Sequence, residues 1–288
     1  MRIDPRTGRI AGEVRVSIRT IPRLATGAGA IWMLTLHDVT RIDPLLGRAE
    51  RPFHLRRPSV AFVAGAGALW IADYDDSVLH KLDPRTGQEL ASISGIGLHA
   101  EAMAATKSAI WVASIGPWTK NSHGEITPVG PGTVTRVDAR TNRVVARVAV
   151  GRGPGAIATG NGAVWVANSR GLRPDFSVTR IDMGSNRVTA TVRLRQPLAA
   201  VAVGGAYAWV LSPGKLGRGG GLDTSGGTLF RIDSRTSHVV AHRLQGSSLP
   251  DAIIPARGSL WIGSPGNGYV LRVKPKTMRA TRTLIPFG

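Results

Sequence analysis

Cysteine is absent from the 288-residue chain, which excludes disulfide bonds, thiolate metal sites and cysteine nucleophiles. Aromatic residues make up 5% of the sequence, fewer than a stacking surface for single-stranded nucleic acid would need. No apolar run approaches the ~20 residues that a membrane-spanning helix requires. Acidic residues are also scarce, 18 against 37 basic ones, and the formal net charge is +19.

The excess of positive charge has two interpretations. Such a field would attract nucleic acid, anionic polymers or acidic membrane surfaces. Alternatively, the composition reflects an arginine-rich proteome that uses arginine on solvated strand edges. No block of consecutive like charges marks a binding patch. Polyanion or nucleic-acid binding through the basic surface is therefore one functional alternative, and a steep fall of binding with salt would identify it.

A short motif with a central tryptophan occurs six times, and a basic-aliphatic-acidic tripeptide follows each copy. The tryptophans are Trp32, Trp70, Trp111, Trp165, Trp209 and Trp261. The tripeptides begin at Arg41, Lys81, Arg136, Arg180, Arg231 and Arg272, and the last one ends in Lys274 instead of aspartate. A repeat of about 40 residues that is rich in strand formers is typical of a β-propeller.

Each repeat predicts a blade of four strands. A short apolar strand and a glycine turn lead to the tryptophan strand, whose alternation places tryptophan on one face and branched residues on the other. Both faces should then be buried between neighbouring blades. The third strand ends in the tripeptide, and a turn such as Asp83–Gly87 leads to the outer fourth strand. Ser237 and Met278 stand where this turn has glycine, so we expect looser turns there.

We therefore expect an all-β chain that forms a single β-propeller domain over residues 1–288. Six full blades of four strands are predicted, at 21–56, 58–96, 98–151, 153–195, 197–246 and 249–288. Residues 2–16 match only the outer half of a further blade. A seven-blade ring with one incomplete blade, whose upstream sequence is missing, is the preferred interpretation, and a six-blade ring with a stray hairpin is the alternative. An N-terminal targeting signal cannot be read from a chain that begins inside a repeat.

A binding site is expected on the face where the loops before the first strand and after the second strand emerge, here called the mouth. Three of these loops are long, at 114–132, 168–176 and 212–227. Nine acidic residues map to this face, whereas the others lie in turns or on outer strands. They are Asp38, Asp73, Asp75, Asp76, Glu101, Glu125, Asp175, Asp223 and Asp251. The mouth should therefore be less positive than the rest of the surface.

One set of side chains at the mouth could carry chemistry. His99 and Glu101 lie where one blade begins, and His123 and Glu125 lie in the long loop of the same blade. Asp251 has the position of Glu101 in a later blade. Imidazoles and carboxylates suit a divalent metal ion or acid/base catalysis. The catalytic candidates are His99, Glu101 and His123, and the metal-ligand candidates are His99, Glu101, Glu125 and Asp251. Structural or solvated histidines are the alternative interpretation.

Trp118 lies outside the repeats, in a long loop, where a partly exposed indole would contact a ligand or partner. The ligand-binding candidates at the mouth are Arg23, Tyr74, Asp75, Trp118, Lys120, Asn168, Arg170 and Asp251. Two glycine-rich segments are not phosphate loops. A strand instead of a helix follows 151–155, and 219–221 lacks the lysine-hydroxyl pair.

The pattern Trp-Val-Ala-Asn, then Thr-Arg-Ile-Asp and a Gly or Asn turn, is clearest over 163–192. It resembles YVTN-type and virginiamycin B lyase-like propellers, and through the repeats the resemblance covers nearly the whole chain. The resemblance implies a propeller fold and, for the lyase proper, opening of the ring ester of streptogramin B antibiotics by elimination, with a histidine and Mg²⁺ at the mouth. The second strand of the lyase typically reads Trp-Phe-Thr-Glu, whereas this chain has Trp-Val-Ala or Trp-Ile-Ala. The catalytic segment of the lyase has Glu-x-His, whereas His99 and Glu101 stand here in the reverse order.

We expect a non-enzymatic ligand- or protein-binding propeller, a sensor or interaction domain that acts through its mouth loops. A metal-dependent lyase resembling virginiamycin B lyase, with Mg²⁺ as cofactor, is the alternative. The expected partner is a small molecule or a protein at the mouth, or else an anionic polymer. We expect a monomer without a transmembrane segment, and the YVTN-type relatives imply an extracytoplasmic location.

Overall fold

Strands make up the regular structure of the described residues, as the sequence predicts. The computed structural model describes residues 2–14, 16, 22–120, 122, 126–171, 174–216, 222–223, 226–244, 250–264 and 268–285. Within these ranges no helix has the length and apolar character to cross a membrane. The chain divides into two compact units, one of residues 1–3 and 10–150 and the other of residues 4–9 and 151–288.

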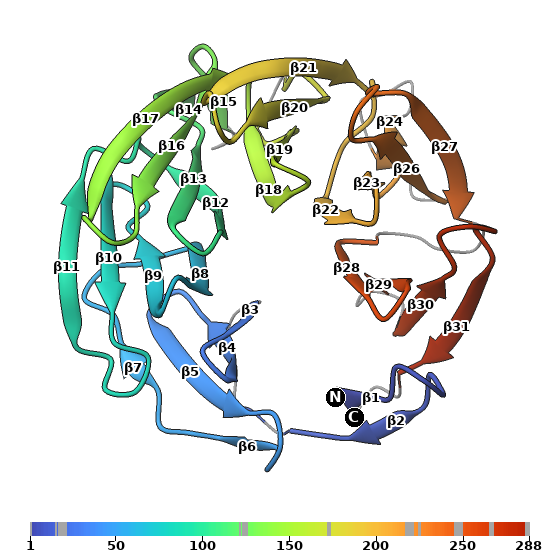
Figure 1. Ribbon diagram of the computed structural model, residues 1–288, viewed down its shortest axis with the longest axis horizontal. Coiled ribbons are helices and arrows are strands. Elements are labelled where there is room, and N and C mark those ends of the chain that lie inside the picture. Colours follow the sequence, from blue (N-terminus) through green and yellow to red (C-terminus); the bar gives the residue numbers. More distant parts are fainter. Residues whose placement is uncertain are drawn as a thin grey trace. The chain divides into compact units, whose positions relative to one another are not determined.

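Three antiparallel sheets follow one another in the first unit (Figure 1). The first has β3 (Arg23–Gly27), β4 (Ala30–Leu34), β5 (Asp38–Asp43) and an outer strand split into β6 (Arg48–Ala49) and β7 (Phe53–His54). The second has β8 (Ala61–Gly65), β9 (Ala68–Ala72), β10 (Val78–Leu82) and β11 (Glu89–Ser94). The third has β12 (Ala100–Ala105), β13 (Ala109–Ser114), β16 (Gly132–Asp138) and β17 (Arg143–Val150).

Three further four-stranded sheets make up the second unit. The fourth sheet has β18 (Pro154–Gly160), β19 (Ala163–Asn168), β20 (Ser177–Asp182) and β21 (Arg187–Arg193). The fifth has β22 (Ala200–Gly204), β23 (Tyr207–Ser212), β26 (Gly227–Asp233) and β27 (Val239–Leu244). The sixth has β28 (Ala252–Ala256), β29 (Ser259–Ser264), β30 (Tyr269–Val273) and β31 (Ala280–Leu284).

Short hairpins accompany the sheets. They are β1 (Arg2–Ile3) with β2 (Ile10–Gly12), β14 (Trp118–Lys120) with β15 (Ile126–Pro128), and β24 (Lys215–Leu216) with β25 (Leu222–Asp223). The last two lie inside long loops of the mouth. Within the second unit, the turn at 4–9 contacts the sixth sheet, because Arg272 Nη1 donates to the Arg6 carbonyl at 3.1 Å and Thr283 Oγ1 donates to the Gly8 carbonyl at 2.8 Å.

The basic residue of the tripeptide has a packing role in four of the six repeats, where it lies over the repeat tryptophan. Lys81 pairs in register with Trp70, and Arg136 pairs with Trp111 in the next sheet. Lys81 Nζ lies 5.0 Å from the Trp70 ring centroid, and Arg136 Cζ lies 5.2 Å from that of Trp111. These cation–π contacts cover one side of each indole. They explain why tryptophan and a cation recur together in the repeat.

The aspartate of the tripeptide closes the turn that follows it. Asp83 Oδ1 accepts the backbone N–H groups of Arg85 at 2.7 Å and Thr86 at 2.9 Å. The turns expected to be loose are closed as well, since Ser237 and Met278 take φ of 60° and 56° and donate backbone hydrogen bonds of 2.9 and 2.8 Å. The prediction of looser turns is therefore wrong. The same backbone hydrogen bond that closes the glycine turns closes these two, and Ser237 and Met278 take the positive φ without glycine.

Acid should destabilise the fold through these turns. Backbone N–H groups lower the pKa of the turn aspartates below the usual value of 3.8, in Asp4, Asp43, Asp83, Asp138, Asp182 and Asp233. A carboxyl group whose pKa is lower in the folded state stabilises that state above its unfolded pKa, and this stabilisation is lost as the pH falls through the folded pKa. The melting temperature should therefore fall below about pH 3.8.

Thermal unfolding followed by circular dichroism from pH 7 to pH 2.5 would measure this effect. Asp83→Asn keeps an acceptor but removes the titrating group, so its melting temperature should fall less steeply with acid than that of the unchanged chain. Equal slopes for the two proteins would contradict the assignment to the turns.

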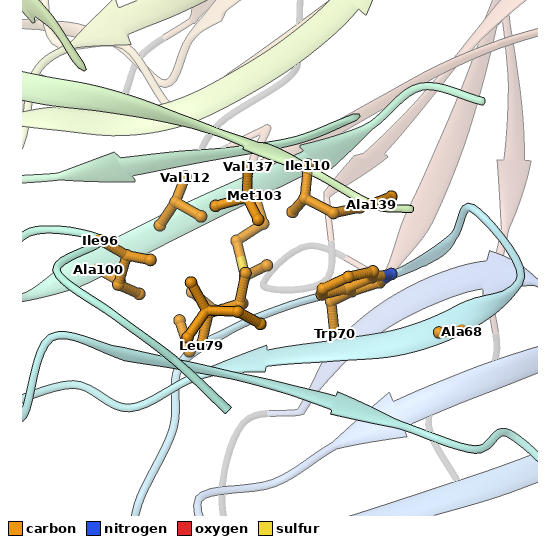
Figure 2. Packing of buried hydrophobic residues seen from close by; sticks show 13 residues of the cluster. Ala68, Trp70, Leu79, Ile96, Ala100, Met103, Ile110, Val112, Val137 and Ala139 are labelled. Carbon is orange, nitrogen blue, oxygen red and sulfur yellow. The ribbon is translucent and has the colours of Figure 1, made fainter. Parts of the chain in front are cut away.

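Tryptophan side chains fill the space between successive sheets. Trp70 packs in one buried cluster with Met103, Ile110 and Val112 of the third sheet (Figure 2). In the second unit, Trp165 packs in the same way with residues of the fifth sheet. The alternation of the tryptophan strand therefore has the predicted result, because both of its faces are buried between sheets.

The first strands of neighbouring sheets approach closely. In the first unit β3 contacts β8 and β8 contacts β12, and in the second unit β18 contacts β22 and β22 contacts β28. A Cβ atom built on Gly65 would lie 2.4 Å from the Cβ of Ala105, and one on Gly160 would lie 2.5 Å from Val203. The glycines that end these strands are therefore needed for the approach as well as for the turn.

The first and sixth sheets each have a face that is less covered than the faces between sheets. Leu24 in β3 is 66% exposed, whereas Phe62 and Met103 at the same register position are 8% and 9% exposed. Trp261 in the sixth sheet is partly exposed, whereas Trp165 is 0% exposed. Apolar side chains whose counterparts in other sheets are buried are thus open to solvent in the first and sixth sheets.

Candidate functional site

Seven of the side chains predicted at the mouth form one connected group in the first unit, here called the mouth cluster. They are Arg23, Tyr74, Asp75, His99, Glu101, Trp118 and Lys120. They come from the start of β3, the loop after β9, the start of β12 and the hairpin after β13. Because strands of a blade alternate in direction, first strands begin and second strands end at the same edge. This topology brings the loops of three sheets together.

His99 lies in the middle of the mouth cluster. Its Nδ1 donates to the Gly116 carbonyl at 2.8 Å, and its Nε2 lies 3.6 Å from Asp75 Oδ1. Its ring centroid is 5.1 Å from that of Tyr74 and 4.9 Å from that of Trp118. A carbonyl accepts but cannot donate, so Nδ1 carries a proton. The hydrogen bond from Nδ1 therefore fixes the orientation of the ring, and Nε2 faces Asp75.

Glu101 is a buried carboxylate, with 3% of its surface exposed. Its Oε1 accepts the Tyr74 hydroxyl at 3.4 Å, and its Oε2 lies 3.9 Å from Arg23 Nη2. Burial of a charged group is costly unless it is paired and hydrogen-bonded. Glu101 therefore joins Arg23 of the first sheet to Tyr74 of the second.

Trp118 and Lys120 form the outer part of the mouth cluster, on β14. Lys120 is exposed, and its Nζ lies 5.1 Å from the Trp118 ring centroid. The Trp118 indole N–H is buried and has no hydrogen-bond acceptor among the residues that the structure describes. A buried donor without an acceptor costs free energy, which an acceptor on a bound molecule would recover.

Acidic residues of the mouth lie beside basic side chains throughout the first unit. The pairs are Asp38 with His54, Asp73 with His80, Asp75 with His99, Asp76 with Arg57, and Glu101 with Arg23. Sequence analysis grouped the carboxylates correctly on loops of one edge, but it did not find their partners. Some partners lie on a paired strand, as His54 does, and others on a strand or loop of another sheet, as Arg23 and His99 do, so the sequence alone does not show them. A less positive mouth remains a prediction.

Three candidates lie in the second unit. Asn168 is fully buried, and its Nδ2 donates to Ser177 Oγ at 3.1 Å and Thr179 Oγ1 at 2.9 Å. Arg170 is exposed. Asp251 precedes β28, and the loss of water around its carboxyl group raises its pKa. The Asn168 side chain thus joins β19 to β20 within its own sheet, whereas Arg170 is open to solvent.

A metal site at the mouth would depend on residues that are not described. Across the described ranges, no three or more His, Asp or Glu side chains are grouped so that they could hold a metal ion. His123 and Glu125 lie outside the described residues. The carboxylate beside His99 is Asp75, whereas Glu101 contacts Tyr74 and Arg23. Two donors fall short of the three protein ligands of a typical catalytic centre, so no catalytic step follows from them.

The arrangement of sheets is that of known propellers. No protein-family model matches the chain, and no curated protein matches its sequence. A structure of hydrazine synthase from Kuenenia stuttgartiensis is similar, with a TM-score of 0.70 and 15% identity, over 93% of this chain and 80% of that one. The WD40 domain of Pan2 from Neurospora crassa has a TM-score of 0.68 and 10% identity, over 93% and 79% of the two chains. The likeness shows the fold alone, a β-propeller with six blades here, and confirms that part of the sequence prediction.

Proposed function

We propose that the chain is a binding propeller that holds a small molecule or a protein segment on the mouth cluster. The observation that supports this most strongly is the grouping of Tyr74, His99 and Trp118 at the ends of strands fixed by packing. Aromatic side chains with a polar atom provide large contact areas at little cost in conformational entropy. Loops on a rigid scaffold are the usual place for such contacts.

The polar groups of the mouth cluster restrict what would bind. The Trp118 N–H has no acceptor among the described residues, and the exposed carboxylate of Asp75 and ammonium of Lys120 flank the rings. A flat ligand with a carbonyl or similar acceptor at its edge would stack on the aromatic rings and receive the indole N–H. A peptide group or a heterocycle has both properties.

Screening of the full chain against metabolite and peptide libraries by thermal shift would test this proposal. For compounds that bind at the mouth cluster, Trp118→Ala should weaken affinity at least tenfold, as expected for a central aromatic contact. Lys107→Ala is the matched control, because Lys107 is exposed in the turn between β12 and β13, at the opposite edge of the same sheet. The proposal would be contradicted if no compound that binds lost affinity in Trp118→Ala or in His99→Ala.

The same assay would separate binding from the lyase alternative. His99 anchored through Nδ1 leaves Nε2 directed at Asp75, which is how proteins orient an imidazole for a metal or for a proton transfer. Stabilisation by Mg²⁺ that is lost in His99→Ala would favour a metal-dependent lyase resembling virginiamycin B lyase. Stabilisation by organic compounds without Mg²⁺ would favour simple binding.

We also infer a seven-blade ring in which residues 2–16 supply only the outer half of one blade. Exposure of Leu24 on the first sheet and of Trp261 on the sixth supports this, since both side chains lack the cover that their counterparts have. β1 and β2 form a two-stranded hairpin, and the outer half of a four-stranded blade also has two strands. Membership of the YVTN-type or virginiamycin B lyase-like propellers is proposed from the repeat motif.

A further inference from the structure

A histidine occupies a register position in the second sheet that other sheets fill with neutral residues. His80 pairs with Ile71, the residue after the repeat tryptophan. Its counterparts are Thr40, Thr135, Thr179, Phe230 and Leu271. All five counterparts are buried, whereas the His80 side chain is 26% exposed. The second sheet therefore has an ionisable group, open to solvent, at a packing position.

The partner of His80 is unusual in the same way. Asp73 lies three residues after Trp70, where the other repeats have Thr35, Ser114, Asn168, Ser212 and Ser264. In the fourth sheet Asn168 Nδ2 donates to Thr179 Oγ1 at 2.9 Å, and in the second sheet Asp73 Oδ2 lies 3.2 Å from His80 Nε2. An ionisable pair thus replaces a neutral pair at the same two positions.

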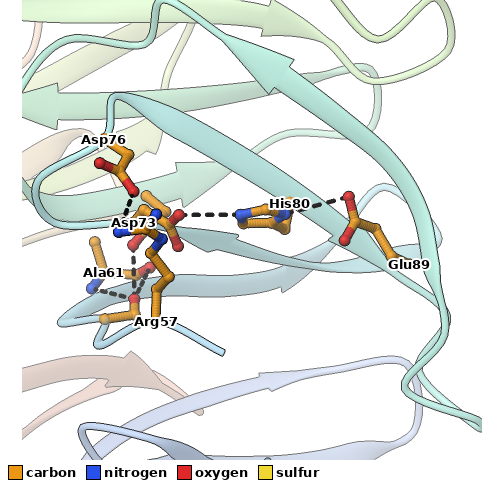
Figure 3. Close-up of polar contacts among 8 residues, drawn as sticks. Arg57, Ala61, Asp73, Asp76, His80 and Glu89 are labelled. Atoms are coloured by element: carbon orange, nitrogen blue, oxygen red, sulfur yellow. Dashed lines mark hydrogen bonds and ion pairs between the residues drawn. The ribbon is translucent and has the colours of Figure 1, made fainter. Parts of the chain in front are cut away.

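A second carboxylate completes a triad. Glu89 Oε1 lies 3.3 Å from His80 Nδ1, on the other side of the ring from Asp73 (Figure 3). Two carboxylates flank one imidazole ring, so negative charge predominates in the triad.

The triad lines a cavity of about 440 Å³, a volume typical of small-molecule sites. The cavity lies beside the split in the outer strand of the first sheet, between β6 and β7, where Pro52 cannot donate a backbone hydrogen bond. Phe53 and Leu55 line it from this segment, and Ile71 and Leu82 line it from the second sheet. It thus combines an apolar lining with the charged triad.

The segment 53–57 also brings basic side chains to the cavity. Arg57 Nη1 forms an ion pair with Asp76 at 2.8 Å, and His54 Nδ1 lies 3.0 Å from Asp38. Arg56 is exposed and forms no ion pair among the described residues. After the other paired groups are set aside, the cavity has an unpaired positive charge at Arg56 and a surplus of negative charge at the triad.

We propose that this cavity binds a small zwitterion with an apolar body, of the chemical class of a free hydrophobic amino acid. The ligand carboxylate pairs with Arg56, and the ligand ammonium pairs with Glu89 and Asp73. The ligand side chain packs against Phe53 and Leu55. An anion or a cation alone would meet only one of the two surplus charges, and the other would stay unpaired.

Calorimetric titration of the full chain with three related probes tests the charge requirement. L-phenylalanine carries both charges, N-acetyl-L-phenylalanine carries only the carboxylate, and L-phenylalaninamide carries only the ammonium. We expect L-phenylalanine to bind at least tenfold more tightly than either derivative. Absence of L-phenylalanine binding at millimolar concentration, or equal affinity for either derivative, would overturn the proposal.

Substitutions at the residues that line the cavity, one of which copies a pair found in another sheet, test where the ligand binds. The double variant Asp73→Asn with His80→Thr recreates the neutral pair of the fourth sheet, and it should lose binding at least tenfold while staying folded by circular dichroism. Arg56→Gln changes only an exposed side chain and should also lose binding tenfold, whereas Arg85→Gln in the exposed turn between β10 and β11 of the second sheet should not.

Trp118→Ala separates this site from the mouth cluster. L-phenylalanine should bind this variant as tightly as it binds the unchanged chain. Loss of binding in Trp118→Ala, with binding kept in Arg56→Gln, would assign the amino acid to the mouth cluster and overturn the proposal.

Discussion

Trp165→Ala should lower the free energy of unfolding by about 3–5 kcal/mol, and Trp261→Ala by roughly half of that. Trp165 is 0% exposed and packs with Val201 and Val210 of the next sheet. Trp261 is partly exposed in the sixth sheet. Removal of a buried indole loses its transfer free energy and leaves a cavity, whereas removal of a partly exposed one leaves a space that water can enter.

The two tryptophans form a matched pair for this comparison. Arg180 Cζ lies 5.9 Å from the Trp165 ring centroid, and Arg272 Cζ lies 5.4 Å from that of Trp261. Each substitution therefore removes a similar cation–π contact, and the difference between them reflects cover by a neighbouring sheet. Urea unfolding followed by far-ultraviolet circular dichroism gives both values without depending on tryptophan fluorescence. Equal losses would show that the sixth sheet is covered in solution as fully as the fourth.

The fold could be predicted because its repeat uses residues with fixed physical roles. Tryptophan, the cation that stacks on it and the aspartate that closes the turn recur in nearly every repeat. The sequence showed their spacing, and alternation along the strands showed that both faces are buried. From the sequence, the cation was only part of the tripeptide that ends the third strand, because its contact with tryptophan is made across strands and depends on the register.

The mouth cluster could be predicted in part. Loops at one edge of successive blades converge, so Tyr74, His99 and Trp118 were expected on the same face, and the structure places them in contact. The neighbours of each group were not predicted. We expected His99 and Glu101 to act together, but Glu101 is buried against Tyr74 and Arg23. His99 precedes β12 and has a positive φ of 56°, so strand alternation does not relate its side chain to that of Glu101, and Tyr74 is the neighbour that both contact.

The triad at His80 was missed, although the sequence contained a signal for it. Read alone, His80 is an ordinary residue of a strand, and Asp73 was counted only as one of nine acidic mouth residues. When the six repeats are aligned by their tryptophans, the other repeats have threonine or a larger apolar residue at the position of His80. At the position of Asp73 they have neutral polar residues. In repeat proteins, an ionisable residue at a position that other repeats keep neutral is a better indication of a site than its local sequence.

Leu24→Ala should cost less than about 1 kcal/mol of unfolding free energy, whereas Met103→Ala should cost about 2–5 kcal/mol. Both residues lie on the first strand of a sheet, opposite the residue that follows the repeat tryptophan. Met103 is 9% exposed and packs in the cluster of Trp70, whereas Leu24 is 66% exposed. In an uncovered position the truncation removes little buried surface and leaves no cavity.

Urea unfolding of both variants, at several protein concentrations, would measure these costs and show whether a second copy covers the face. A small loss for Leu24→Ala supports a ring in which the half blade of residues 2–16 lacks its inner strands. A loss as large as that of Met103→Ala would mean that Leu24 is buried in solution. The half-blade interpretation would then be wrong, because its main support is the exposure of Leu24 at a position where Phe62, Met103, Val201 and Ile253 are buried.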